Sequence, residues 1–310
     1  MNFVRQITKV SLVIILVLVV SGCTKGVSPS QEPLQQQVSQ SAIDKEKNIM
    51  NNFNTLMQKR DVTIPEIIKF IDENIAAVSQ ENASNMVIAL EKVQSGKLPP
   101  LQDKFADSEV VQKVLMKSFQ REMTSNSITN IENKEGKDLL LDTYNSGFKV
   151  ETAEGMYFPV IDYSFYKKYR NAVTQDIASF IDIMAIESDK TPIKDAALTI
   201  NWVEILKRAS TQERFIKDYS NSAKAEDMRQ LLKRYTAFAL YGANNTPLFS
   251  YDTNQMVTAA KNAYLGTIFD VNSGSFSKVM NGYLAVLKKN DYKLTSEVQE
   301  YRNKASEEIK

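Results

Sequence analysis

The sequence predicts a mostly α-helical protein, an irregular multi-helix bundle that contains one short β-hairpin near residues 148–161. Apolar residues recur every three to four positions through most of the chain, as on the buried face of a helix. The 310 residues include only 10 glycines and 8 prolines, too few for the many tight turns of an all-β sandwich. No fixed-period repeat is visible, so a regular repeat array is not expected.

The first element, residues 1–23, has the make-up of an export signal. Arg5 and Lys9 are the only charges before Cys23, and an apolar run of eleven residues occupies positions 10–20. This run is shorter than the roughly 17 residues that a membrane-spanning helix needs. It ends in Val20-Ser21-Gly22-Cys23, where small residues precede the only cysteine of the chain.

This arrangement resembles the lipobox of bacterial lipoprotein precursors. The resemblance implies that residues 1–22 are a signal peptide, that cleavage falls between Gly22 and Cys23, and that the Cys23 sulfur receives a diacylglyceryl group. An N-acyl chain such as palmitate would follow on the new N-terminus. Two or three acyl chains anchor a protein stably, at about 0.8 kcal/mol per buried methylene. We therefore expect a lipid anchor on the extracytoplasmic face of the cell membrane; an uncleaved signal anchor or a buried helix is the alternative.

Composition excludes several classes of function. Lys+Arg is 38 and Asp+Glu is 37; without Arg5 and Lys9 the mature chain would hold 36 cations against 37 anions, a balance that argues against nucleic acid as a partner. The chain has no histidine, which removes Ser-His-Asp catalysis and His-ligated zinc. With Cys23 lipidated, no thiol remains for disulfides or thiol chemistry. We expect no metal site and no cofactor besides the lipid on Cys23.

The next two elements are a tether and a helical subdomain. Residues 23–41 carry prolines, serines and a glutamine run, which predicts a flexible tether. Residues 42–125 predict an N-terminal helical subdomain that opens with a capping box, Thr63-x-x-Glu66, and Pro65 in the first helical turn. A second helix is expected to stop at Gly96 and Pro99-Pro100. A third helix follows from its apolar stripe, Val110, Val111, Val114, Leu115 and Phe119.

Residues 126–310 predict a C-terminal helical domain, set off by the polar stretch 124–133. The hairpin comes first: residues 148–151 alternate, residues 153–155 can turn, and Pro159 restricts the second strand to an edge. A helix is expected to begin at a Ser210-x-x-Glu213 cap. The clearest later helices are indicated by two apolar stripes: Met228, Leu231, Leu232, Tyr235 and Phe238; and Phe276, Val279, Met280, Tyr283, Leu284 and Leu287.

Aromatic residues concentrate at positions 144–169, which hold eight of the 28 in the chain. Aromatic faces beside carboxylates often hold sugars or cationic groups. Tyr157, Tyr163, Tyr166 and Glu151 are therefore candidate ligand-binding residues, and an unidentified glycan or protein of the cell envelope is the expected partner. The alternative is that these aromatic side chains pack the hairpin onto the helices.

Two functional hypotheses follow. The favoured one is a lipid-anchored binding or interaction module of the cell envelope. The other is a His-free, carboxylate-dependent cell-wall glycan hydrolase that uses Glu154 and Asp162. Such a pair must lie about 5 Å apart in a retaining enzyme and about 6.5–9.5 Å apart in an inverting one. The part from Glu154 to Leu265 is similar to uncharacterised helical lipoproteins of Gram-positive bacteria, a resemblance that implies no activity.

Overall fold

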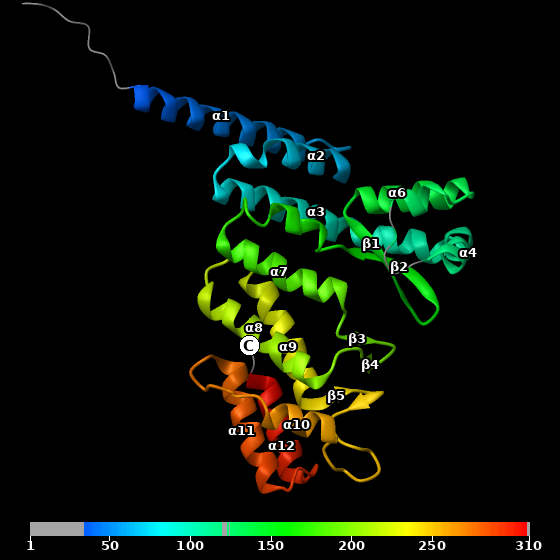
Figure 1. The fold of residues 1–310 in the computed structure, drawn as a ribbon, viewed down its shortest axis with the longest axis vertical. Coiled ribbons are helices and arrows are strands. Elements are labelled where there is room, and N and C mark those ends of the chain that lie inside the picture. Colours follow the sequence, from blue (N-terminus) through cyan, green and yellow to red (C-terminus); the bar gives the residue numbers. More distant parts are fainter. Residues whose placement is uncertain (1–33, 120–122, 124, 309–310) are drawn as a thin grey trace, which may run out of the picture. The chain divides into compact units, whose positions relative to one another are not determined.

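The computed structural model describes residues 34–119, 123 and 125–308 (Figure 1). The expected lipobox, with Gly22 and Cys23, lies outside the described residues. Within the described part the chain divides between Ile43 and Asp44, and the second unit begins at Asp44. Twelve α-helices and three two-stranded sheets form the described part. The prediction of a mostly α multi-helix fold with a small β-hairpin is confirmed.

Helix α1 (Leu34–Met57) begins inside the segment expected to be a tether. The expected tether therefore overlaps this helix at residues 34–41, while residues 24–33 lie outside the described part. Leucine and glutamine are good helix formers, and a helix that is held at its far end extends at low cost. In the second unit, Ile49 and Phe53 of α1 are buried, and their packing fixes this end of the helix.

Helix α2 (Ile64–Asn74) begins at the predicted capping box. The Thr63 amide donates to Glu66 Oε2 at 2.9 Å, and the Glu66 amide donates to Thr63 Oγ1 at 3.4 Å. Pro65 stands in the first turn, as expected. The helix ends in a short 3₁₀ segment, η1 (Ile75–Ala77). Its apolar stripe faces the core through Ile64, Ile67, Ile68 and Ile71.

Helix α3 (Gln80–Asp107) continues past Gly96, Pro99 and Pro100, where we expected it to end. The predicted end at Gly96 and Pro99-Pro100 is wrong. Each internal proline costs a helix about 3 kcal/mol or more. The turns beyond the prolines offset this cost because Leu101 and Phe105 are buried there, and because Gln102 Nε2 donates to Pro159 O at 3.1 Å.

Helices α4 (Glu109–Ser118), α5 (Ser125–Thr129) and α6 (Lys134–Asn145) complete the first part of the second unit. The polar stretch 124–133 does not separate two cores. Ile128 and Ile131 within it are buried in the same hydrophobic cluster as residues from Phe53 to Ile181. The expected boundary at residue 125 therefore does not coincide with a division between cores, which falls near residue 180.

The predicted hairpin is confirmed. Strands β1 (Phe148–Ala153) and β2 (Met156–Ile161) pair antiparallel, with Phe148 opposite Ile161. The turn uses the left-handed conformations of Glu154 (φ 51°) and Gly155 (φ 78°). Gln112 of α4 covers the outer edge of β2: its Nε2 donates to Tyr157 O at 2.8 Å, and the Tyr157 amide donates to Gln112 Oε1 at 3.0 Å.

Helix α7 (Gln175–Asp189) follows the 3₁₀ segment η2 (Phe165–Tyr169) and serves both cores. Ile177 and Ile181 belong to the first core, and Phe180 and Ile183 belong to the second. Figure 1 shows α7 between α3 and the antiparallel pair α8 and α9. The two cores are therefore continuous through one helix.

The second core is built from the remaining elements. These are β3 (Ile193–Lys194), β4 (Ala197–Leu198), α8 (Trp202–Asp218), α9 (Ala225–Tyr241), β5 (Gly242–Ala243), β6 (Thr246–Pro247), α10 (Thr258–Leu265), α11 (Ser275–Lys289) and α12 (Ser296–Glu308). The predicted stripes of α9 and α11 are buried apart from the partly exposed Leu284. The expected helix start at Ser210 is wrong: α8 begins earlier, where the Glu204 amide donates to Asn201 Oδ1 at 2.9 Å.

Candidate functional site

Tyr163 and Tyr166, two of the predicted ligand-binding residues, pack into the protein rather than line a surface. Tyr166 is 2% exposed and its hydroxyl donates to Gln94 Oε1. The Tyr163 hydroxyl donates to Glu91 Oε1 at 2.6 Å, and its ring meets Phe180 edge to face. Aromatic rings held in this way join helices, so the packing alternative describes these two tyrosines.

Tyr157 and Glu151 lie on the hairpin but do not form a joint site. Glu151 is opposite Phe158, and Tyr157 is opposite Thr152. Because side chains alternate along a strand, these two pairs point to opposite faces of the hairpin. Tyr157 packs on Phe119 with ring centres 5.1 Å apart. Glu151 instead forms an ion pair with Lys194 at 3.5 Å.

Glu154 and Asp162, the carboxylate pair proposed for hydrolysis, stand at opposite ends of the hairpin. Glu154 occupies the turn, and Asp162 follows the last residue of β2. At about 3.3 Å per residue, the strand separates them by about 20 Å. Asp162 is also engaged, since it pairs with Lys149 at 3.8 Å and accepts the Ser164 amide at 3.0 Å. This pair cannot act together on one glycosidic bond.

A buried ion pair joins α3 to the segment before α9. Glu91 is 6% exposed and contacts the ammonium of Lys224, which also lies 2.9 Å from Asp227. Burial by itself lowers the pKa of Lys224, but the charge and hydrogen bond of Glu91 outweigh it, so the pKa is raised. The cation therefore stays charged inside the protein. A cavity of about 10 Å³ beside this pair has room for about one water.

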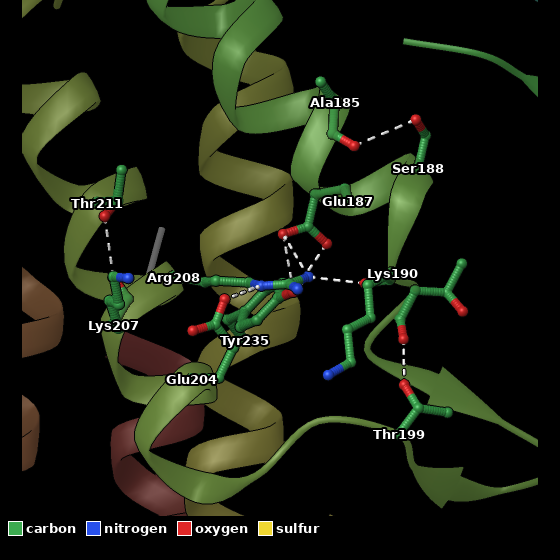
Figure 2. A network of polar contacts seen from close by, with 11 residues as sticks. Ala185, Glu187, Ser188, Lys190, Thr199, Glu204, Lys207, Arg208, Thr211 and Tyr235 are labelled. Atoms are coloured by element: carbon green, nitrogen blue, oxygen red, sulfur yellow. Dashed lines mark hydrogen bonds and ion pairs between the residues drawn. The ribbon is translucent and has the colours of Figure 1, made fainter. Parts of the chain in front are cut away.

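A second buried network connects α7, α8 and α9 (Figure 2). The Arg208 guanidinium donates to Glu204 at 2.9 Å, to the Lys190 carbonyl at 2.9 Å and to Glu187 at 3.4 Å. Tyr235 adds its hydroxyl to the Glu187 carboxylate. Burial raises the pKa of Glu187 against the opposing effects of Tyr235 and Arg208.

The Arg208 network has the character of a structural element. Its charged atoms are paired with one another or with a backbone carbonyl, as buried charges require. A raised pKa alone marks functional sites and structural ion pairs alike. Because Tyr235 is fully buried and Arg208 is 6% exposed, we assign the network to holding α7, α8 and α9 together.

The structure contains an open cleft at a place that sequence patterns did not indicate. It has a volume of about 400 Å³, within the range of about 300–1,000 Å³ found for ligand pockets. One wall is the loop before α2, a second is the C-terminal half of α3, and a third is the end of α6 with the start of β1. The floor is apolar, since Ile64, Leu101 and Phe148 line the cleft while being largely buried.

Charged side chains surround this apolar floor. Arg60 stands on the loop wall, and Lys97 and Lys104 stand on the α3 wall. All three are exposed, and within the described part of the chain none of them forms an ion pair. Asp61 and Asp142 also line the cleft and are likewise without an ion-pair partner among the described residues.

Lys97 and Lys104 were missed as site residues because the helix that carries them was expected to end at Gly96. Lys97 and Lys104 are two helical turns apart, about 10 Å, and share one face only if α3 is continuous. The available signal was the apolar spacing of Leu101 and Phe105 beyond the prolines. Read as one helix with residues 80–96, this spacing places Lys97, Leu101 and Lys104 side by side.

The described residues offer neither a metal site nor a membrane-spanning helix. No three Cys, Asp or Glu side chains are grouped there so that they could hold a metal ion. None of the described helices combines the length and the apolar character needed to cross a bilayer. Comparison with known proteins assigns no family: no family model matches the chain, and no curated protein and no solved structure is significantly similar to it.

Proposed function

We propose that this protein is a lipid-anchored binding module on the extracytoplasmic face of the cell membrane, and that the cleft between α2, α3 and α6 is its ligand site. One observation supports the binding role above others. The cleft combines an apolar floor with charged side chains that have no partner within the described protein. Unpaired polar groups around a concave apolar surface are typical of ligand pockets.

The anchor rests on the lipobox resemblance of residues 20–23. Cys23 would carry the diacylglyceryl and N-acyl chains, and these chains would hold the module to the membrane. The glycan hydrolase receives no support from the hairpin, because its two carboxylates are about 20 Å apart. We therefore propose binding, with a ligand or partner of the cell envelope, as the function.

The anchor is tested by labelling cells that express the full chain with radioactive palmitate. We expect label on the wild type and none on Cys23→Ala, since the sequence has no other cysteine that could receive the diacylglyceryl group. Ser21→Ala is the matched control, because alanine is also small, and it should keep the label. Labelled palmitate on the Cys23→Ala protein would overturn the anchor.

The cleft is tested with a photo-crosslinking residue placed at either of two adjacent prolines. Pro99 and Pro100 are both exposed on α3, but only Pro100 lines the cleft. Benzoylphenylalanine at position 100, in the full chain in living cells, should give an adduct after irradiation. The same residue at position 99 should not. Equal yields at both positions, or no adduct at position 100, would contradict a ligand site in this cleft.

A further inference from the structure

The cations of the cleft are arranged on two walls that face a common space. Arg60 comes from the loop before α2, while Lys97 and Lys104 come from α3. A guanidinium binds two oxygens of a phosphate at once, and an ammonium acts as a compact point charge. Three such groups, with no partner among the described residues, suit one phosphate group better than a single carboxylate.

The carboxylates of the cleft limit the kind of phosphate compound that fits. Asp61 and Asp142 line the same space, so the summed charge of the five ionised groups is only +1. A long polyanion would be repelled by the two carboxylates as its further charges approached them. A carboxylate accepts hydrogen bonds from hydroxyl groups. A ligand that contacts both the cations and the carboxylates of the cleft therefore carries a phosphate and neighbouring hydroxyl groups.

We propose that the cleft binds the phosphate ester of a polyol or sugar, with the phosphate on Arg60, Lys97 and Lys104 and the hydroxyls on Asp61 and Asp142. This inference rests on the proposed function, since it names the ligand class of the same site. The carbon chain of the polyol lies over the apolar floor around Leu101. Either a soluble phosphate ester or a lipid headgroup supplies this chemistry.

The test uses the full chain in uncharged detergent micelles, titrated calorimetrically with glycerol 1-phosphate, with inorganic phosphate and with glycerol. We expect glycerol 1-phosphate to bind more tightly than inorganic phosphate, and glycerol alone to show no saturable binding. The double variant Lys97→Gln, Lys104→Gln should weaken binding of glycerol 1-phosphate at least tenfold. The matched control, Lys207→Gln with Lys233→Gln, removes two exposed lysines of α8 and α9 and should bind as the wild type does.

A separate variant tests the proposed contacts between the ligand hydroxyls and the cleft carboxylates. Asp142→Asn should reduce the advantage of glycerol 1-phosphate over inorganic phosphate and should not weaken the binding of inorganic phosphate itself. The source is distinguished by competition: micelles containing phosphatidylglycerol displace glycerol 1-phosphate if the ligand is a lipid headgroup, and micelles containing phosphatidylcholine do not. If neither kind of micelle displaces glycerol 1-phosphate, the ligand is a soluble phosphate ester.

Two results would overturn the phosphate proposal. One is no saturable binding of glycerol 1-phosphate; the other is equal binding by the cleft variant and the control variant. Neither outcome affects the crosslinking result at Pro100. An adduct at position 100 without phosphate binding would therefore leave the binding module in place and reject only this ligand class.

Discussion

Tyr235 on α9 donates its hydroxyl to both carboxylate oxygens of Glu187 on α7, at 2.8 Å from Oε1 and 2.7 Å from Oε2. The same phenolic oxygen lies 3.1 Å from Arg208 Nη1 on α8. One buried hydroxyl thus touches a buried anion and a buried cation from two other helices. Its position makes the contact energetically important, because a charge without its partner is costly inside a protein.

Tyr235→Phe should destabilise the protein markedly. The ring would stay packed on Phe238, 5.7 Å away, but Glu187 would lose the donor that helps to hold its charge. We expect the free energy of unfolding to fall by about 1.5–3 kcal/mol, measured by urea denaturation. Tyr251→Phe is the control: Tyr251 is 74% exposed, so the change should be about 0.5 kcal/mol or less. Equal losses in the two variants would contradict the role of the network.

Asp189 should make stability depend on pH in a defined direction. Its carboxylate accepts the Ser164 hydroxyl at 2.9 and 2.7 Å and the Lys149 ammonium at 3.1 Å. Burial alone would raise the pKa of Asp189, but these donors lower it below the ordinary value. A lowered pKa stabilises the fold above the unfolded pKa of about 3.9, and this stabilisation is lost as the pH falls through the folded pKa.

Asp189→Asn is the variant that measures this dependence. The wild type should be more stable than the variant at pH 7, by about 1 kcal/mol or less because Asp189 is half exposed and screened by solvent. The gap should close as the pH falls below about 4. Urea denaturation of both proteins at several pH values gives the measurement. A gap that stays constant down to pH 3 would argue against the lowered pKa.

Gly147→Ala should be far more damaging than Gly155→Ala. Both glycines adopt positive φ, +72° and +78°, which costs other residues of the order of 1 kcal/mol. A Cβ at Gly147 would also lie 2.5 Å from Gln94 Nε2, whereas a Cβ at Gly155 meets nothing within 4 Å. Gln94 is buried and donates to Ser146 O at 2.7 Å, so it cannot move aside without losing that bond.

The difference between the two glycine variants isolates the steric effect. We expect Gly155→Ala to lower the free energy of unfolding by about 1 kcal/mol through backbone strain. Gly147→Ala should lose an additional 1–3 kcal/mol or so, since a buried polar group is displaced. Thermal and urea unfolding of the pair provide the test. Similar losses would mean that Gln94 adapts without cost.

Gln112→Leu should open the outer edge of the hairpin. Gln112 supplies both a donor and an acceptor to Tyr157 of β2, in place of a neighbouring strand. Loss of a hydrogen bond worth about 1 kcal/mol should speed exchange of the Tyr157 amide about fivefold. Gln102→Leu is the control, because Gln102 contacts only the Pro159 carbonyl on this strand. Faster exchange of the Tyr157 amide in both variants would point to general loosening of β2 instead.

Local sequence patterns predicted the elements whose ends are decided by neighbouring residues. The Thr63 and Glu66 capping box forms as expected because its donors and acceptors lie within one turn. The hairpin forms where alternation, a turn and Pro159 predicted it. Prediction failed at α3, where a local helix-breaking signal at Pro99 and Pro100 is overridden by the burial of Leu101 and Phe105.

The candidate site was harder to predict than the fold. The aromatic residues selected at positions 157, 163 and 166 share a stretch of sequence but not a surface. Tyr166 is directed into the core by Gln94, and Tyr163 is held by Glu91. Density of aromatic residues along a chain does not distinguish packing from binding, because both bury large side chains. The cleft depends on three segments far apart in the sequence.

The amino-acid pattern alone was enough to predict the mostly α-helical fold class, the hairpin and the apolar faces of several helices, since periodicity and capping act over a few residues. The absence of histidine also excludes imidazole chemistry on composition alone. Three features depend on the three-dimensional packing: α3 continues past its prolines, Glu154 and Asp162 are separated, and Arg60 shares a cleft with Lys97 and Lys104. Such relationships depend on packing between distant segments, and local patterns carry no information about that packing.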